Sequence, residues 1–481
     1  MALLVKPASE TALATVLIEL LNNPVERAAM GGRGPNWSRY FTSSGVGDQL
    51  LELYRLVVSR RPETPSLRLE TKLCYVAYPS SLTLKSANAI QTFSTVRELK
   101  RLAPQTLVLL PKLPGRISAF SEVGAQHLLR VPLNFFSNFP LLKKIPWSYL
   151  ERMIFVAEVG LYLLWRRLTG RGCQVIYVRD VICAYWLIAF WRALLGAKVI
   201  YEAHDLEARN PSRAQSKRLS AFLQKVDRVI LGQADGVVSL TTAFKDFLGI
   251  DGWRETTEPA TVIPDAYDAN RYLPLSQSDC RQKLGLNQAE FVIVYAGLTF
   301  AYRGLERMIE AFGEFLEQSG AKAKLYFVGG RPFEVSQLRE VAAKAGLVEQ
   351  VQLIGQTDQK QVNLWLNAAS LTVIPDTVTD ITASPLKMFE YAAVARPVML
   401  PDLPALREIL GEEAIYFERG NKQAIVAALG WVYNQPAEAE AKGEAARRKV
   451  AAYTYENRAK AILEFVAEIR NAQLITDKYQ G

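Results

Sequence analysis

A serine, a proline, a lysine and a glutamate lie close together in the C-terminal half of the chain. Ser384 and Pro385 stand where a helix is expected to begin, because serine favours the N-cap and proline the first turn. The free N–H groups of a helix start bind phosphate, and Lys387 adds positive charge beside them. Glu390 follows about a turn and a half into the helix. Its carboxylate can accept hydrogen bonds from two sugar hydroxyls, so the spacing suits a nucleotide sugar.

Glycines follow several apolar segments that are expected to be strands. Gly297 ends one of them, with Arg303 shortly behind it at the start of the next helix. Gly329 and Gly330 end a second segment, and Ile354 ends a third. Open parallel sheets bind ligands at the carboxyl ends of their strands, and glycine allows close backbone approach there. We therefore expect Gly297 and Arg303 to form part of the phosphate site, and Gly329, Gly330 and Ile354 to lie at the ligand-binding edge of the same sheet.

Two further strand ends lie in the N-terminal half. His204 and Asp205 end one apolar segment, in a chain with only two histidines. A lone histidine is commonly structural, but this position at a carboxyl edge suits a cleft residue that contacts the donor. The loop that contains Ser86, Ala87 and Asn88 follows the first strand, and we expect it to form the acceptor side of the same cleft.

Strand-like and helix-like segments alternate along most of the chain, which indicates an α/β fold with doubly wound parallel sheets. In the first series we expect strands at 72–78, 106–110, 175–178, 198–202, 236–240 and 260–263, and helices at 88–102, 181–195 and 213–231. In the second series we expect strands at 291–296, 324–328, 351–354, 371–374 and 397–400, and helices at 305–319, 333–345, 360–368, 385–394 and 403–410. Two Rossmann-like domains facing each other across a cleft follow from this pattern.

Residues 382–397 read Thr-Ala-Ser-Pro-Leu-Lys-Met-Phe-Glu-Tyr-Ala-Ala-Val-Ala-Arg-Pro. This stretch resembles the signature of retaining nucleotide-sugar glycosyltransferases of family 4, in the branch that reads Ser-Pro-Leu-Lys, an apolar pair, then Glu-Tyr. The resemblance implies the GT-B fold over about residues 72–470. It also implies that Leu386 and its neighbours bind the donor, that Glu390 binds the ribose, and that no cofactor is needed beyond the donor itself.

The chain departs from that family at several donor contacts. Thr382 replaces a glutamate expected near the donor sugar, and Leu298 replaces an arginine expected on the diphosphate. Arg303 stands where a lysine is usual, and Lys387 can supply another cation. By resemblance, His204 faces the transferred sugar. The expected catalytic residues are therefore His204, Arg303 and Lys387, acting on the leaving diphosphate without a metal.

An internal similarity at an offset of 412 relates the start of the chain to its end, because residues 3–42 match residues 415–454 in pattern. By resemblance, residues 1–66 correspond to the tail of a second glycosyltransferase. The complete copy then comprises an acceptor domain at 67–270, a nucleotide-sugar domain at 271–454, and a helix at 455–472 that returns to the first domain. Alternatively, the two segments match only by coincidence, because each contains a pair of helices of similar composition.

Composition restricts the partners. The formal charge is +9 and the pI is near 9.2, which favours anionic partners. No nucleic-acid motif accompanies this charge, so nucleic acid is not expected. The four cysteines and two histidines lack zinc-site spacing, and no metal site is expected. The first residues lack a signal-peptide core, and the longest apolar windows are too short to span a bilayer. A cytoplasmic protein is expected.

Residues 129–171 have an unusual local composition, in which aromatic and aliphatic residues alternate with lysines and arginines. One interpretation is an interfacial segment that settles into an anionic membrane surface, where lipid-linked acceptors are presented and the protein is peripheral at the inner face. The other is a core helix whose basic residues extend toward solvent. The sequence alone favours neither.

The sequence as a whole predicts a retaining, hexosyltransferase-like enzyme of polysaccharide biosynthesis, which moves a sugar from a nucleoside diphosphate sugar to a glycan or lipid-linked hydroxyl. A non-catalytic sugar-nucleotide binder or scaffold is the alternative, since Thr382 and Leu298 replace two expected donor contacts. A nicotinamide-dependent oxidoreductase is disfavoured, because Gly-x-Gly-x-x-Gly follows neither first strand.

Overall fold

The structure is a computed structural model that describes residues 22–23, 72–84, 86–139, 147–209, 217–250, 252–254, 259–377 and 385–480. The chain divides between Arg68 and Leu69 into two compact units. The first unit lies almost wholly outside the described residues, as does the prediction that residues 1–66 are the tail of a second copy. The second unit, Leu69–Gly481, contains two parallel sheets.

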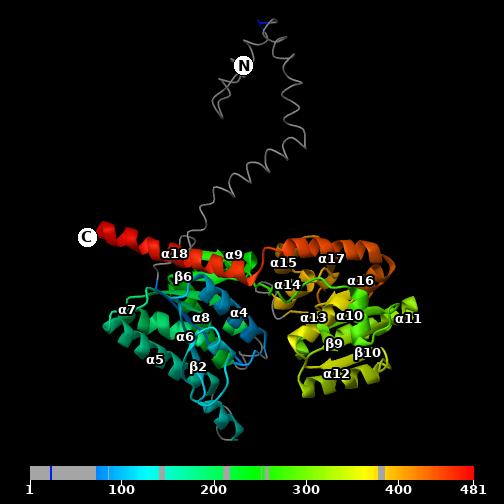
Figure 1. The fold of residues 1–481 in the computed structure, drawn as a ribbon, viewed down its shortest axis with the longest axis horizontal. Coiled ribbons are helices and arrows are strands. Elements are labelled where there is room, and N and C mark those ends of the chain that lie inside the picture. The colour runs from blue at the N-terminus through cyan, green and yellow to red at the C-terminus, as the bar shows by residue number, and fades with distance from the viewer. Residues whose placement is uncertain are drawn as a thin grey trace. The chain divides into compact units, whose positions relative to one another are not determined.

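The first sheet has seven parallel strands in the order β3-β2-β1-β4-β5-β6-β7. Its part of the chain is coloured blue to green in Figure 1. Its strands are β1 (Leu73–Val76), β2 (Leu107–Lys112), β3 (Gln126–Leu129), β4 (Val175–Val178), β5 (Lys198–Ala203), β6 (Gly236–Ser239) and β7 (Ala260–Val262). The α-helices between them are α4 (Ala87–Leu102), α5 (Trp147–Leu168), α6 (Val181–Trp186), α7 (Arg192–Leu195), α8 (Lys217–Gln233) and α9 (Thr242–Ile250). Shorter helical segments are η2 (Ala119–Ser121), η3 (Leu133–Asn138), the π-helical η5 (Leu187–Trp191) and η6 (Glu207–Arg209).

The second sheet has six parallel strands in the order β10-β9-β8-β11-β12-β13. Its strands are β8 (Phe291–Ala296), β9 (Ala323–Val328), β10 (Val351–Gly355), β11 (Leu371–Val373), β12 (Val398–Pro401) and β13 (Ile415–Phe417). The accompanying helices are α10 (Gln277–Leu284), η7 (Ala301–Arg303), α11 (Leu305–Ser319), α12 (Pro332–Lys344), α13 (Gln359–Ala368), α14 (Leu386–Ala393), α15 (Pro404–Leu410), α16 (Lys422–Asn434) and α17 (Pro436–Val450).

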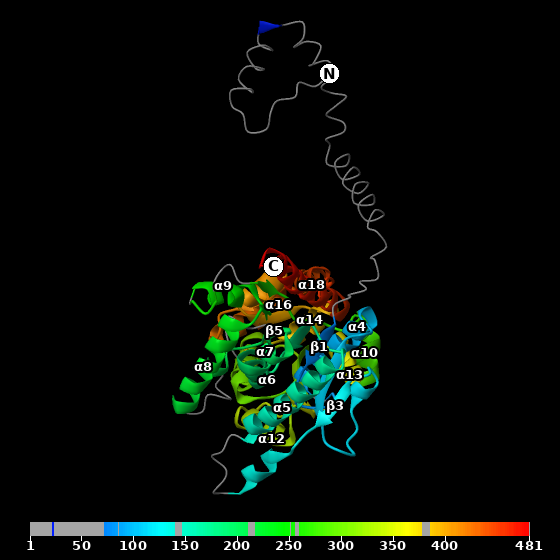
Figure 2. The same ribbon diagram turned by 90° about the vertical axis from the view of Figure 1, so that its left-hand side faces the viewer.

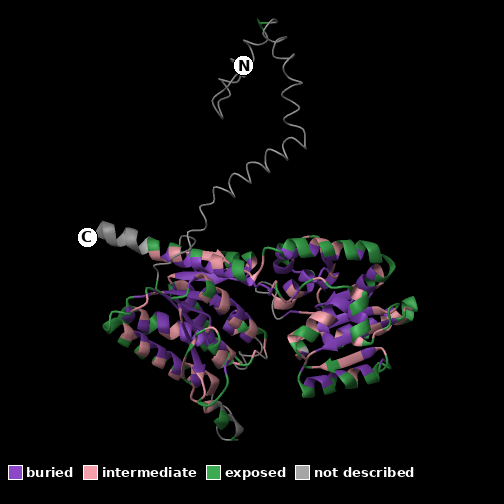
Figure 3. Ribbon diagram, viewed as in Figure 1, coloured by how far each residue is buried: buried purple, intermediate pink, exposed green. Residues whose placement is uncertain are grey.

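Helices cover both faces of each sheet, so the strands read as continuous apolar runs. On β8, Val292 and Val294 face one buried cluster while Ile293 and Tyr295 face the other, which is the alternation that a strand imposes. Figure 3 shows the resulting buried layers between exposed outer helix surfaces. The structure therefore confirms the predicted fold of two doubly wound domains. Among the described helices, none combines the length and apolar character needed to cross a bilayer.

The last helix, α18 (Tyr455–Gln480), follows α17 and returns to the first domain, where it packs against α4 and β5 (Figures 1 and 2). The segment between β7 and β8 crosses in the opposite direction. The Tyr267 amide donates to the carbonyl of Tyr453 at 3.0 Å, so the two crossing segments are hydrogen-bonded to each other. The return of α18 brings residues of distant sequence into the first domain.

Candidate functional site

A cavity of about 600 Å³ lies at the carboxyl ends of strands from both sheets. Its first-domain wall consists of residues in and before the start of α4: Thr83, Leu84, Ser86, Ala87 and Ile90. Its second-domain wall is made by Tyr272, Ala296, Gly297, Leu298, Arg303, Val328, Gly329, Gly330, Gln356, Thr357, Asp358, Gln359, Val362, Pro385, Leu386, Lys387 and Glu390. The size is in the range of small-molecule and cofactor sites.

Lys387 lies in the first turn of α14, and its ammonium group points to the end of β8. Its Nζ donates to the Tyr295 hydroxyl at 2.8 Å and lies 4.1 Å from the centre of that ring. The Tyr295 hydroxyl donates in turn to the Leu298 carbonyl. Burial, together with the charge of Arg303, holds the pKa of Lys387 well below its ordinary value. An anion beside Nζ would favour the protonated form and would be bound more tightly for that reason.

Glu390 lines the cavity one turn further along α14. Burial raises the pKa of its carboxyl from 4.5 to about 7, while the Tyr272 hydroxyl, Lys387 and Arg271 act in the opposite direction. Tyr272 is almost fully buried and its hydroxyl is hydrogen-bonded to this carboxyl. The carboxyl therefore has a fixed neighbour on one side and the cavity on the other.

Arg303 ends the short helix η7, directly before Gly304 and α11. Its guanidinium carbon lies 5.1 Å from the centre of the Tyr302 ring. Its Nε is covered and has no hydrogen-bond acceptor among the described residues. Arg303 also lines the cavity, so its remaining guanidinium N–H groups are the ones placed to meet an anion there.

The glycines at the strand ends leave room for Lys387 and for close backbone approach. Gly297 has φ +145°, and a Cβ there would come within 2.5 Å of Lys387 Nζ. At Gly329, with φ +124°, a Cβ would lie 2.3 Å from the Gly297 carbonyl oxygen. Any side chain at position 297 would displace the Lys387 ammonium group. The site therefore requires glycine there.

The structure thus brings together most of the predicted donor-binding residues: Gly297, Gly329, Gly330, Pro385, Leu386, Lys387 and Glu390, with Arg303. Ser384 and Thr382 lie outside the described residues. On the acceptor side, Ser86 and Ala87 line the cavity, whereas Asn88 is exposed and does not. Ser86 caps α4 by accepting from the Ala89 amide at 3.3 Å.

Ile354 is not part of the cavity wall. The pairing of β10 with β9 shifts register between Leu353 and Gly355, and Ile354 is 41% exposed at this irregularity. The shift turns its side chain away from the site. The cavity is lined instead by the next residues, Gln356 to Gln359. A bulge leaves no mark in the apolar pattern, so the sequence could not locate this change.

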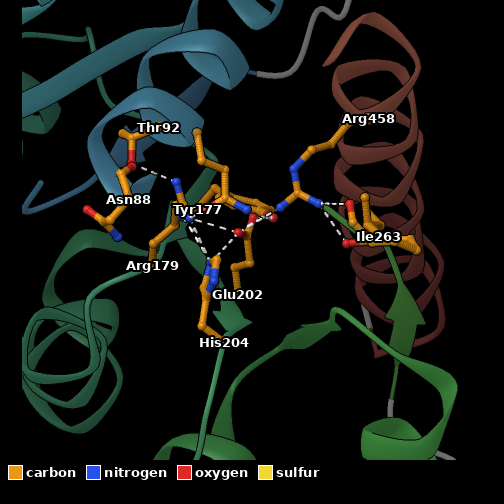
Figure 4. Close-up of polar contacts among 10 residues, drawn as sticks. Asn88, Thr92, Tyr177, Arg179, Glu202, His204, Ile263 and Arg458 are labelled. Atoms are coloured by element: carbon orange, nitrogen blue, oxygen red, sulfur yellow. Dashed lines mark hydrogen bonds and ion pairs between the residues drawn. The ribbon is translucent and has the colours of Figure 1, made fainter. Parts of the chain in front are cut away.

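His204 also lies outside the cavity wall. Its Nε2 is 2.6 Å from Glu202 Oε1 and 2.8 Å from Arg179 Nη2, as Figure 4 shows. Burial and the nearby Arg179 charge lower the pKa of His204 to about 4, so the ring is neutral near pH 7. Its contact with donor sugar remains a prediction.

Behind His204 lies a buried polar network around Glu202. Its carboxylate pairs with Arg179 Nε at 3.1 Å and with Arg458 Nη2 at 2.7 Å, and it also accepts from the Tyr177 hydroxyl. Although burial favours the neutral acid, Arg458 and Arg179 hold the pKa of Glu202 well below its ordinary value. Glu202 is therefore ionised and fully compensated.

Each arginine of this network ties another element to β5. Arg179 Nη1 donates to Thr92 Oγ1 on α4 at 2.6 Å. Arg458, from α18, donates to the carbonyl oxygens of Ile263 and Pro264 where the chain leaves β7 (Figure 4). The network thus connects α4, whose start lines the cavity, with the returning helix and the interdomain crossover.

Sequence reasoning missed Tyr272, Tyr295 and the stretch from Gln356 to Gln359. Tyr272 and Tyr295 act through hydrogen bonds to residues far along the chain, which no local pattern reveals. Among the described residues, no group of three or more His, Cys, Asp or Glu side chains could hold a metal ion.

Known proteins resemble this chain in sequence. Residues 276–449, which contain nearly all of the second domain, match the family model described as "Glycosyl transferases group 1". The lipopolysaccharide core biosynthesis mannosyltransferase LpsB of Rhizobium meliloti (strain 1021) is 23% identical over 308 residues, which cover 62% of this chain and 80% of LpsB.

Solved structures extend the likeness to both domains. Sucrose-phosphate synthase from Thermosynechococcus elongatus superimposes with a TM-score of 0.66 at 17% identity, covering 83% of this chain and all of that one. Anabaena HepE in complex with UDP-glucose gives a TM-score of 0.62 at 15% identity, covering 82% of this chain and 99% of HepE. At these identities the likeness establishes the fold, which is the GT-B fold expected from the sequence.

Proposed function

From the match of residues 276–449 to the group 1 glycosyltransferases, we propose that the chain transfers a sugar from a nucleoside diphosphate sugar to a hydroxyl of a glycan or lipid-linked acceptor. The anomeric configuration is retained. The donor bond between the anomeric carbon and the phosphate oxygen breaks, and the acceptor oxygen bonds to the same carbon from the same face. The acceptor proton passes to the departing phosphate.

One observation supports this proposal above all: Lys387, Arg303 and Glu390 line a single cavity. The leaving diphosphate develops negative charge, and Lys387 and Arg303 are the cations beside which that charge would be stabilised without a metal. Glu390 is placed to accept from the two ribose hydroxyls. HepE, which shares the fold, was solved with UDP-glucose, and this makes uridine diphosphate sugars the first donors to test.

Turnover by the purified full chain tests the proposal. Labelled glucosyl and mannosyl donors of uridine and guanosine diphosphate are incubated with a lipid extract as acceptor, and nucleoside diphosphate release is followed. We expect Lys387→Met and Arg303→Ala each to lower kcat by about 10²–10³-fold, as the loss of one charge-stabilising donor does. A chelator is expected to leave the rate unchanged.

Two exposed cations of the same domain provide matched controls. Lys344 and Arg339 lie on the outside of α12, away from the cavity. Lys344→Met and Arg339→Ala should retain the wild-type rate. If the protein binds donors but turns over none of them, it is a non-catalytic sugar-nucleotide binder. If the control variants lose as much activity as Lys387→Met and Arg303→Ala, these two cations have no special role in catalysis.

A further inference from the structure

Helix α5 carries apolar residues on two opposite faces. Its inner face is buried in the first-domain core through Phe155, Val159 and Leu163. Gly160 lies so close to Trp191 that a Cβ there would be 2.1 Å from the ring. The inner face is therefore fully used by packing against η5 and the sheet, and it accounts for the core-helix interpretation of this segment.

The outer face of α5 is apolar as well. Met153, Leu161, Trp165 and Leu168 are spaced three, four or eight residues apart and are 38%, 62%, 54% and 79% exposed. Residues at this spacing form one stripe along a helix, and Figure 3 shows exposed positions along the outer side of α5. A helix of this length extends about 33 Å. Soluble monomers rarely leave so long an apolar stripe in water.

Further exposed apolar residues flank both ends of the stripe. Leu194 lies beside its C-terminal end, where Arg167 Nη1 donates to the Leu194 carbonyl at 3.2 Å, and Phe190 is exposed on the neighbouring η5. At its N-terminal end, the ring of Phe136 lies 5.2 Å from that of Trp147, the first residue of α5. Phe135 and Phe139, both exposed, complete an aromatic group there, with ring centres 5.8 Å apart.

Unpaired positive charge accompanies this surface. Arg166 and Arg167 lie in the last turn of α5, and Arg171 follows the helix. The hydrogen bonds of Arg166 go to the Arg171 carbonyl and the Tyr162 hydroxyl, and none of the three pairs with a carboxylate among the described residues. Glu158 also lies on α5, and burial raises its pKa above the ordinary value.

We propose that the outer face of α5, with the Phe135–Phe136–Phe139 group, docks on an anionic phospholipid surface. Aromatic and aliphatic side chains enter the headgroup boundary, and Arg166, Arg167 and Arg171 meet lipid phosphates. The uncompensated arginines favour this occupant over a second copy of the chain, whose formal charge of +9 would repel them.

The orientation of the sheet relates this surface to the cavity. The aromatic group follows the carboxyl end of β3, and the cavity loop follows the carboxyl end of β1, which lies in the same parallel sheet. Both therefore lie at the same edge. A membrane against α5 would present a lipid-linked hydroxyl on the cavity side. This acceptor role rests on the proposed function, whereas the docking itself does not.

Co-sedimentation of the full chain with vesicles tests the docking. One set of vesicles contains phosphatidylcholine alone and the other contains phosphatidylcholine with phosphatidylglycerol. We expect binding to the second set only. Arg167→Gln and Arg171→Gln should each weaken it about fivefold, and Trp165→Gln combined with Leu168→Gln about tenfold or more. These side chains are exposed, so the variants should fold normally.

Phe333, which is 73% exposed on α12 of the second domain, is the matched control, and Phe333→Gln should bind vesicles like the wild type. Absence of wild-type binding, or equal losses in the control, would overturn the proposal. So would a dimer in sedimentation that Trp165→Gln with Leu168→Gln dissociates, because a second copy would then cover this face. Affinity for UDP, measured separately, should not change in the α5 variants, so a failure of donor chemistry is distinguishable from a failure of docking.

Discussion

The two domains treat their buried charges in different ways. In the first domain, Glu202 is surrounded by Arg179, Arg458, Tyr177 and His204, and its charge is compensated within the protein. In the second domain, burial holds the pKa of Lys387 well below its ordinary value and raises that of Glu390 to about 7. Burial therefore shifts both groups toward their neutral forms, because neighbouring charges do not fully offset the loss of water.

This difference in charge compensation distinguishes the structural network of the first domain from the binding site of the second. A completed ionic network fixes the elements that it joins, here β4, β5, α4, α18 and the crossover after β7. An incomplete set of charges in a cavity can gain stability from a ligand that carries the missing partners. Breaking the first set should therefore affect unfolding, and breaking the second should affect ligand binding and turnover.

Removing Glu202 should give the largest change in stability. Glu202→Ala leaves the buried guanidinium groups of Arg179 and Arg458 without their shared carboxylate. We expect the free energy of unfolding to fall by about 3–5 kcal/mol, as measured by guanidinium denaturation. Glu349→Ala, at an exposed position, should change it very little. A loss below about 1 kcal/mol for Glu202→Ala would mean that the network does not hold the scaffold.

Substituting Gly297 should damage the site through geometry alone. Gly297→Ala places a Cβ where Lys387 Nζ lies and strains a backbone at φ +145°, at a cost of about 1–3 kcal/mol. We expect both weaker UDP binding in calorimetry and lower stability. Gly346→Ala also has positive φ but meets no atom within 4 Å, so it should lose stability without losing UDP affinity. Unchanged UDP affinity in Gly297→Ala would mean that Lys387 does not contact UDP.

The pKa of Glu390 predicts a pH dependence of stability. Because the folded-state pKa is raised from 4.5 to about 7, the unfolded chain loses this proton first, and stability falls as pH rises between these values. Glu390→Gln removes that dependence. Its urea midpoint relative to wild type should therefore rise from pH 4.5 to pH 7 and then stay level. A constant difference across this range would contradict the shift.

A contact between the domains should give the smallest effect. Glu408 on α15 accepts from the Thr242 amide at 2.8 Å and from its hydroxyl at 2.6 Å, at the start of α9. Glu408→Ala should lower stability by about 0.3–1 kcal/mol, which is typical of a carboxylate at a helix N-terminus. High salt should reduce this difference, and an unchanged difference would argue against an electrostatic contact.

Much of the second domain was predictable because its patterns are local. The bounds of β8 and α11 match the sequence prediction, since an apolar run ends at Gly297 and an amphipathic helix ends at Gly320. The first domain was harder. Strand β3 lies at the sheet edge with mostly uncovered side chains, and α5 is apolar on both faces, so neither has a clear period. The expected helix at 181–195 contains the π-helical segment η5.

The residues of the site also differ in how far they could be predicted from local sequence. Lys387 and Glu390 lie on one helix, and Gly297 and Gly329 lie at neighbouring strand ends, so spacing and topology were enough to group them. The surroundings of His204 depend on Arg458, which α18 brings from the far end of the chain. The contact of Tyr272 with Glu390 is equally distant in sequence. Such pairings form only in the folded state.

A crystal structure of the protein with UDP would show whether Lys387, Arg303 and Glu390 bind the donor. We expect a β-phosphate oxygen within about 3.2 Å of Lys387 Nζ or of an Arg303 guanidinium nitrogen, with the ribose hydroxyls on the Glu390 carboxylate. UDP bound away from this cavity, or bound in it with its phosphates directed away from both cations, would exclude this mode of donor binding.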